Sequence, residues 1–189
     1  PAFKAFAENC VFSCPIGLSG QTITRSIYTL NNNPQTKFAN WVAYHVTPET
    51  IDGPSRSRNW KADPELDDES TLEPNDYKGA WRGIGTDRGH QVPLASFSNS
   101  PDWRELNYLS NITPQDSDLN QRPWVKLENA VRGLLARAVA LDLKQVVFWR
   151  CIVVIVVCRS EVFPCLSANS ATQPMGRRRA QDCRPNDKE

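Results

Sequence analysis

The sequence has few histidines and no long apolar run. His45 and His90 are the only histidines among 189 residues, and they do not form a pair with zinc-ligand spacing. The most apolar stretch, residues 146–157, is too short for a membrane span and contains Arg150, which favours a buried strand. No internal repeat is present. The formal net charge of +1 neither requires nor excludes a nucleic-acid partner.

Length and composition are those of one ordinary globular domain with or without a tail. Hydrophobic residues make up 40% of the chain and charged residues 23%, and residues 141–189 are more basic than the part before them. The sequence begins at Pro1, without Met and without a leader, so either a secretion signal has been removed or the sequence omits it.

Six cysteines are present, and two of them, Cys10 and Cys14, lie four residues apart beside Pro15. This spacing can close a small disulfide loop, which would indicate an oxidising compartment. The same spacing could form half of a zinc site, but no Cys/His pair elsewhere completes one. The four cysteines after residue 150 have no motif spacing.

Three segments of the first half have clear patterns. Residues 23–30 favour a strand that ends at the NNNP of residues 31–34. Residues 38–47 alternate, with Trp41, Ala43 and His45 on one face and apolar residues on the other, which predicts a strand. Residues 48–80 are rich in Pro, Asp and Ser and predict a long surface excursion with little regular structure.

The second half predicts an extended segment and a helix. WRGIGTDRGH indicates a short extended segment that leads into a turn near Pro93. Pro123 suits the first turn of a helix, with Asp118 and Asn120 as candidate caps. Apolar residues then recur at helical spacing and predict an amphipathic helix of about four turns: Trp124, Leu127, Val131, Leu134, Leu135 and Ala138.

Several residues could take part in chemistry, although each also has an ordinary structural explanation. His90, in a polar turn-rich setting, could be a general base, but a histidine here is more often a turn residue. Asn111 and Asn120 could offer amide oxygens to Mg²⁺ or could simply cap turns. Glu128 and Arg132 could form an exposed helix ion pair. Arg58 and Arg88 could each bind a phosphate or lie on the surface.

The combination of motifs resembles the DNA/RNA non-specific endonuclease family. The shared segments run from about residue 9 to residue 137, and the DRGH motif followed by NQ-x₆-E is the most specific of them. They are NC-x₃-C at 9–14, YTLNNN at 28–33, TKFANWVAYH at 36–45, RNWK at 58–61, DRGHQVPLAS at 87–96, PDWRELNYLSNITPQ at 101–115, SDLNQ at 117–121 and WVKLE at 124–128.

The resemblance implies an α+β fold of the ββα-metal (His-Me finger) type with an antiparallel central sheet. It implies a Mg²⁺-dependent nuclease that cleaves DNA and RNA without sequence preference and leaves 5′-phosphates. His90 would be the general base, Asn120 the direct Mg²⁺ ligand, and Glu128 would hold the water ligands of the ion. Asn111 would position the His90 region or the phosphate. Three arginines would contact the phosphate or offset its developing charge: Arg58, Arg88 and Arg132. The N-terminal pair Cys10–Cys14 would be a disulfide. If the base has an ordinary histidine pKa, activity should fall as the pH drops through about 6.5.

The resemblance stops after about residue 137. We expect residues 1–140 to form the nuclease core and residues 141–189 to be a divergent tail from a frameshift or truncation, which would leave the fold incomplete at its C-terminal end. The family implies secretion to the cell exterior or periplasm, no membrane partner, and leaves a homodimer open. Two other functions stay open: a non-catalytic or defective nucleic-acid-binding remnant, and a disulfide-stabilised interaction module.

Overall fold

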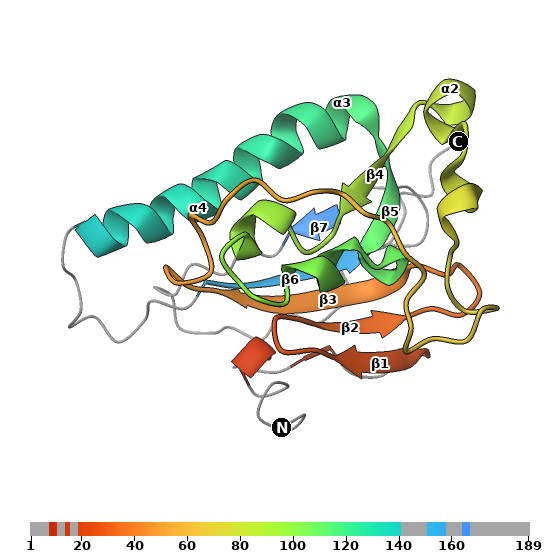
Figure 1. Ribbon diagram of the computed structural model, residues 1–189, viewed down its shortest axis with the longest axis horizontal. Helices are drawn as coiled ribbons and strands as arrows, with labels where there is room; N and C mark the ends of the chain where they lie inside the picture. The colour runs from red at the N-terminus through yellow and green to blue at the C-terminus, as the bar shows by residue number, and fades with distance from the viewer. Residues whose placement is uncertain (1–7, 11–13, 16–18, 141–150, 158–163, 167–189) are drawn as a thin grey trace, which may run out of the picture.

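A five-stranded antiparallel sheet, in the order β1–β2–β3–β6–β7, forms the centre of the computed structural model (Figure 1). Its strands are β1 (Gln21–Thr24), β2 (Thr29–Asn32), β3 (Ala39–Val46), β6 (Cys151–Val157) and β7 (Pro164–Leu166). The structure describes residues 8–10, 14–15, 19–140, 151–157 and 164–166. All four strand pairs are antiparallel, as expected for the central sheet.

Strand β3 confirms the strand predicted for residues 38–47. Its alternating side chains are buried on both faces of the sheet. Val42 and Tyr44 belong to the main core, whereas Trp41 and Ala43 pack on the opposite face with the Cys10–Cys14 pair. β3 therefore contributes side chains to two buried clusters, one on each face of the sheet.

Cys10 and Cys14 are joined by a disulfide, as the resemblance implied. Both half-cystines are buried against Trp41 and Ala43. The pair is therefore not half of a zinc site. The side chains of the other four cysteines lie outside the described part of the chain.

The single strand predicted for residues 23–30 is wrong, because these residues form the β1–β2 hairpin. The chain turns between the two strands, where the Arg25 amide donates to the Tyr28 carbonyl at 2.8 Å. No glycine, proline or asparagine marks this turn. It is held instead by tertiary contacts of the Arg25 side chain.

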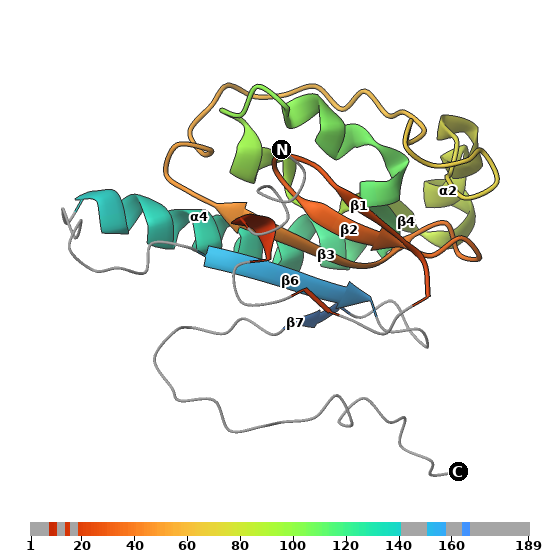
Figure 2. The same cartoon turned by 90° about the horizontal axis from the view of Figure 1, so that it is seen from below.

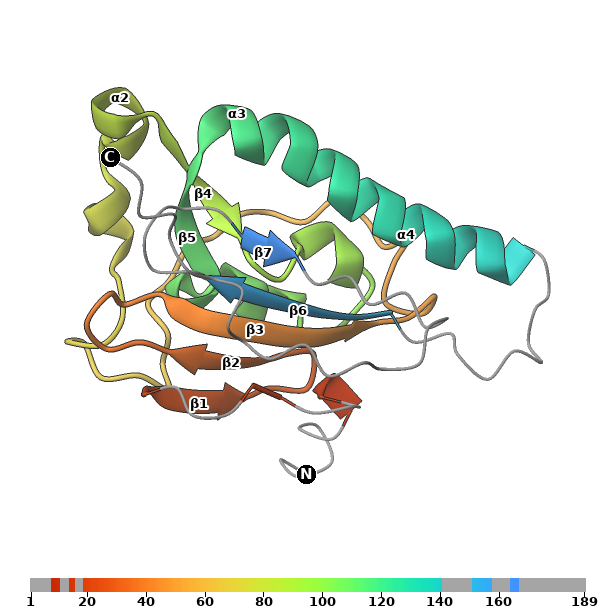
Figure 3. The same cartoon turned by 180° about the vertical axis from the view of Figure 1, so that it is seen from behind.

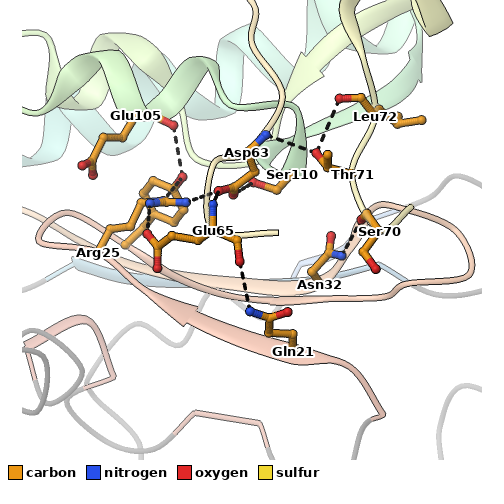
Figure 4. A network of polar contacts seen from close by, with 11 residues as sticks. Gln21, Arg25, Asn32, Asp63, Glu65, Ser70, Thr71, Leu72, Glu105 and Ser110 are labelled. Atoms are coloured by element: carbon orange, nitrogen blue, oxygen red, sulfur yellow. Dashed lines mark hydrogen bonds and ion pairs between the residues drawn. The ribbon is translucent and has the colours of Figure 1, made fainter. Parts of the chain in front are cut away.

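Those contacts tie the long excursion of residues 48–80 to the sheet (Figure 4). Arg25 donates to Asp63 at 2.5 Å and also pairs with Glu65. Asp63 is buried and accepts a second 2.5 Å hydrogen bond from Ser110. The excursion has little regular structure, as predicted, apart from the short 3₁₀ helix η1 (Pro74–Tyr77) and a β-bridge between Lys61 and Tyr108. It is nevertheless anchored in the interior.

A second, two-stranded sheet pairs β4 (Thr86–His90) with β5 (Ile112–Asp116). The short helix α2 (Ala80–Ile84) precedes β4, and three 3₁₀ segments connect the strands: η2 (Leu94–Phe97), η3 (Trp103–Asn107) and η4 (Leu109–Asn111). β4 confirms the extended segment expected at the DRGH motif. Figure 3 shows the hairpin beside the start of α3.

One continuous helix follows β5: α3 (Ser117–Leu119), the π-helical η5 (Asn120–Trp124) and α4 (Val125–Ala140). The helix begins at Ser117, at the SDLNQRPW segment where it is expected, but the predicted caps Asp118 and Asn120 are wrong. The cap is Asp116, whose carboxylate accepts from the Leu119 amide at 3.0 Å. Pro123 lies inside η5 rather than in the first turn. A proline has no N–H and crowds the preceding turn, which accounts for a local departure from α-helical pairing.

The predicted apolar stripe is partly correct. Trp124 and Leu135 pack in the main core under the sheet and Leu127 packs against them, but Leu134 is exposed. Figure 2 shows α4 running alongside the sheet.

The strand predicted for residues 146–157 is present in the part of this segment that the structure describes. Residues 151–157 form β6, which pairs with β3 in a register that places Trp41 opposite Val156. Residues 146–150 lie outside the described part. Within the described residues, no helix is long and apolar enough to cross a bilayer.

Candidate active site

A cleft of about 500 Å³ lies where the β4–β5 hairpin meets α2, the residue 58–60 segment and the start of the long helix. Its polar wall includes six charged or hydrogen-bonding side chains: Arg58, Asp87, Arg88, His90, Asn120 and Glu128. Five of these six were singled out from the sequence. The structure therefore brings together residues that are up to 70 positions apart in the chain.

His90 ends β4 and faces this cleft. Its ring lies 5.2 Å from the Trp60 ring at an angle of 41°. Nε2 is buried and has no hydrogen-bond partner in the described part of the chain. Burial lowers the pKa of His90 to about 4; the Asn107 side chain opposes this shift and the charge of Arg58 adds to it. The imidazole is therefore neutral at pH 7 and able to accept a proton.

The expected acid limb near pH 6.5 does not agree with this environment. An exposed histidine would titrate there, but His90 is desolvated by its neighbours. The ordinary pKa assumed for His90 is corrected to about 4.

Asn111 holds the backbone immediately after His90 instead of lining the cleft. It is completely buried. Its side-chain oxygen accepts from the Val92 amide at 2.8 Å, and its Nδ2 donates to the Val92 and Leu106 carbonyls. Its own carbonyl accepts from the Gln91 amide at 3.0 Å. This position suits support of the His90 segment and not direct contact with a phosphate.

Gly89 allows the two strands of the hairpin to approach closely. A Cβ atom at this position would lie 2.7 Å from the Cβ of Gln115 and 2.2 Å from its Oε1. Any side chain here would push β4 away from β5. Arg88 and His90, on either side of Gly89, would move with the strand.

Arg88 is held by aromatic rings rather than by a carboxylate. Its guanidinium lies 5.2 Å from the centre of the Tyr77 ring and 5.7 Å from that of Trp60, and its Nη2 donates to the Pro74 carbonyl at 3.2 Å. Arg58 lines the same cleft and is exposed. Two guanidinium groups at one cleft suit an anionic ligand such as a phosphate.

Asp87 was not singled out from the sequence, yet it organises one wall of the cleft. Its carboxylate accepts from Asn120 at 3.0 Å, from Gln121 at 2.8 Å and from Ser117 at 3.1 Å. Burial alone would raise the pKa of Asp87, but these three hydrogen bonds lower it below its ordinary value. Asp87 belongs to the DRGH motif, but its partners lie about 30 residues later, and no local pattern reveals them.

Glu128 and Arg132 are mostly buried, so the exposed ion pair considered from the sequence is wrong. Their side chains are 17% and 18% exposed and lie 3.9 Å apart. Burial raises the pKa of Glu128 to about 7, against the opposing effects of Arg132, Trp124 and Arg58. Arg132 also donates to Ser96 at 3.3 Å and to Asn129 at 2.6 Å, so it braces Glu128 from behind the cleft.

The donor atoms at the cleft suit a hydrated divalent cation. The described residues contain no cluster of three or more His, Cys, Asp and Glu side chains that could enclose a metal ion. The cleft instead combines the amide of Asn120 with the carboxylates of Asp87 and Glu128. Hard oxygen donors in small number are typical of Mg²⁺, which keeps several of its waters.

Three aromatic side chains also line the cleft and were not identified as site residues from the sequence: Trp60, Tyr77 and Trp81. Trp60 and Tyr77 contact His90 or Arg88, and Trp81 is connected with the site only because it lines the same cleft.

Comparison with known proteins is consistent with this geometry. Residues 7–145 match the family described as DNA/RNA non-specific endonuclease. A nuclease of Serratia marcescens is 55% identical over 132 residues, which cover 69% of this chain and 49% of that protein. Human mitochondrial endonuclease G is 35% identical over 123 residues, covering 62% of this chain and 40% of that protein.

The fold also agrees with a solved structure. In the crystal structure of the EndoG/EndoGI complex, one chain matches with a TM-score of 0.65 and 21% identity, covering 86% of this chain and 64% of that one. This match confirms the expected α+β nuclease fold. The chain spans about half or less of the length of the two curated relatives.

Proposed function

Because this chain belongs to the DNA/RNA non-specific endonuclease family, we propose that it is a metal-dependent endonuclease that hydrolyses phosphodiester bonds in DNA and RNA. One observation carries the proposal: a neutral, desolvated His90 lies in a cleft shared with Arg58, Arg88 and Glu128. A proton acceptor beside cationic groups is what hydrolysis of a phosphodiester needs.

In the proposed reaction, a water molecule attacks phosphorus while the His90 imidazole accepts its proton. Arg58 and Arg88 bind the phosphate oxygens and offset the negative charge that develops on them. The bond between phosphorus and the 3′ oxygen breaks and the leaving oxygen takes a proton from a water molecule, so the products carry a 5′-phosphate and a 3′-hydroxyl. Asn111 keeps the His90 backbone in place, and Arg132 keeps Glu128 in place.

Mg²⁺ is the cofactor that we propose for this site. Asn120 would bind it directly, and Glu128 and Asp87 would accept hydrogen bonds from its waters. The bound ion would supply Lewis-acid stabilisation of the phosphate and the leaving oxygen. The hydrogen bond from Asn120 to Asp87 supports this arrangement, because it uses the NH₂ group of the amide and so fixes where the oxygen points.

The proposed substrate preference follows from the same side chains. Arginines that contact phosphate carry no sequence information, so cleavage would be largely independent of base sequence. The family match supports acceptance of both DNA and RNA.

A plasmid-nicking assay on the purified chain, with Mg²⁺ or with EDTA, tests the function. We expect cleavage with Mg²⁺ only, and a loss of at least about 100-fold in His90→Ala. His45→Gln is the matched control, because it removes the other histidine at a position outside the cleft.

The competing function is a nucleic-acid-binding remnant without activity. Two results together would favour this function. The wild type and His90→Ala would bind DNA with equal affinity, and neither protein would cleave DNA. Full activity in His90→Ala would contradict the proposed mechanism.

We further propose that the protein acts in an oxidising compartment outside the cytoplasm, as a secreted or periplasmic enzyme. The Cys10–Cys14 disulfide supports this proposal. All candidate site residues lie within residues 58–132, which supports residues 1–140 as the catalytic part. That residues 141–189 form a divergent tail stays a prediction, and two strands of this segment, β6 and β7, belong to the central sheet. A homodimer is a prediction from the resemblance alone, and sedimentation velocity of the purified chain tests it.

A further inference from the structure

Trp81 has an unusual position for a tryptophan. Its side chain is 63% exposed, and it lines the cleft that holds His90. Three of the other tryptophans with described side chains, Trp41, Trp103 and Trp124, are buried. A large exposed ring at a polar cleft marks a place where a ligand can cover it.

The other aromatic rings of the cleft already have partners. Trp60 lies against the His90 ring and beneath Arg88, and Tyr77 lies beneath Arg88 and donates through its hydroxyl to the Ile112 carbonyl. Within the described residues, no ring or guanidinium stacks on Trp81. Its face is therefore available for a molecule that enters the cleft.

The backbone around Trp81 is fixed at both ends of α2. Gly79 and Gly85 adopt left-handed conformations, with φ of 83° and 68°, and the Gly85 amide donates to the Trp81 carbonyl at 3.0 Å. The Gly85 carbonyl in turn accepts from the amide and the hydroxyl of Ser117 at 3.1 and 2.8 Å. These bonds attach the C-terminal end of α2 to the start of the long helix, which fixes the backbone of Trp81 relative to Ser117.

We propose that Trp81 is a stacking platform for an unpaired nucleobase of the bound nucleic acid. This inference rests on the proposed function, since it assumes that Arg58 and Arg88 hold the neighbouring phosphate. An aromatic face accepts any base, so stacking would add affinity without adding sequence preference. A base in a duplex is already stacked on its neighbours, so Trp81 favours single strands and locally unpaired sites.

The test is binding by fluorescence anisotropy in EDTA, with gel analysis to show that the strand stays intact. The probes are a labelled oligodeoxythymidylate and the same sugar–phosphate backbone without bases. We expect Trp81→Ala to weaken binding of the base-bearing strand by about 5- to 100-fold and to leave binding of the abasic strand unchanged. Trp81→Phe should lose less, because it keeps an aromatic face.

Ile84→Ala is the matched control. Ile84 is 72% exposed on the same helix but does not line the cleft, so its variant should bind both strands like the wild type. Equal binding of both probes by the wild type, or no binding at all, would overturn the inference. So would a loss in Trp81→Ala that is the same for both probes, because that result would indicate a disturbed helix.

The same proteins, assayed on plasmid with Mg²⁺, separate this inference from the proposed function. If the wild type does not nick the plasmid, the nuclease proposal fails, while the binding comparison still decides whether Trp81 stacks on bases. If the plasmid is nicked but Trp81→Ala binds both probes normally, the stacking platform alone fails.

Discussion

The side-chain amide of Asn120 donates a hydrogen bond of 3.0 Å to the Oδ2 atom of Asp87. This bond joins the first turns of the long helix to the start of β4. Asp87 also accepts from Ser117 and Gln121, and these hydrogen bonds lower its pKa and favour the carboxylate form. The orientation of a proposed metal ligand is thus set by a carboxylate of the strand that carries the proposed base.

We expect Asp87→Asn to weaken Mg²⁺ binding by about 10- to 100-fold, the usual cost of losing a partner that orients a metal ligand. An amide at position 87 would carry no charge and could turn its NH₂ group toward Asn120. Isothermal titration of the folded variant with Mg²⁺ measures the effect independently of activity. Asp118→Asn, which changes a carboxylate paired with Arg122 on the helix surface, is the control. Equal affinities in the two variants would contradict the role of Asp87.

The pH dependence should be set by Glu128 and not by His90. Glu128 has a pKa raised to about 7, so in the metal-free protein it becomes protonated as the pH falls below 7. His90 has a pKa lowered to about 4, so it stays neutral over this range. At limiting Mg²⁺ we expect activity to fall below pH 7, because only the carboxylate form attracts the cation.

Saturating Mg²⁺ should move this fall to lower pH, and Glu128→Gln should abolish the dependence of Mg²⁺ affinity on pH between 5 and 7. Rate profiles at two Mg²⁺ concentrations and Mg²⁺ titrations at several pH values provide the measurements. An acid limb that stays at pH 6.5 at every Mg²⁺ concentration would instead indicate an ordinary, solvent-exposed histidine as the base.

Gly89→Ala should damage the site without removing any of its functional groups. The new Cβ would overlap Gln115, so the hairpin must open and carry Arg88 and His90 with it. We expect a loss of stability of about 1–3 kcal/mol and a fall in kcat of about 100-fold. Gly133→Ala is the matched control: its Cβ meets no atom within 4 Å, and it should stabilise α4 by about 0.5–1 kcal/mol. Normal kcat in Gly89→Ala would show that the hairpin tolerates the displacement.

Asp63→Ala should be among the most destabilising single substitutions. It would leave the buried guanidinium of Arg25 without its main counter-charge and Ser110 without its acceptor. Removal of one partner from a buried ion pair costs about 3–5 kcal/mol, measurable by urea unfolding. Glu65→Ala provides the comparison, because the side chain of Glu65 is 51% exposed and its loss should cost less than about 1 kcal/mol. Similar losses in the two variants would show that burial of Asp63 is not decisive.

The sequence predicts β3 and the DRGH strand well because their patterns are local. In β3, every second side chain belongs to the same face, so alternation alone identifies the strand. The hairpin at Arg25 is different: its turn has no characteristic residues and depends on Asp63, which lies 38 residues later. The cap of the long helix is not predicted for a related reason, since three acidic or amide residues could serve as caps and only Asp116 makes the bond.

In the site, too, local motifs predict the residues, whereas contacts between distant residues determine their properties. The motif identifies His90, Asn120 and Glu128, and all three line one cleft. Their electrostatic properties come from neighbours that no motif connects with them. Burial lowers the pKa of His90, whose ring packs against Trp60. Burial also raises the pKa of Glu128.

The position of β6 in the sheet has a consequence for how the protein is made. β6 pairs with β3, yet the residues in register, such as Trp41 and Val156, are more than 100 positions apart. During synthesis, every residue of the cleft leaves the ribosome before the strand that covers the β3 edge. Until then β3 is an open template for pairing with another chain. The catalytic groups are therefore synthesised before the strand that completes this edge of the main sheet.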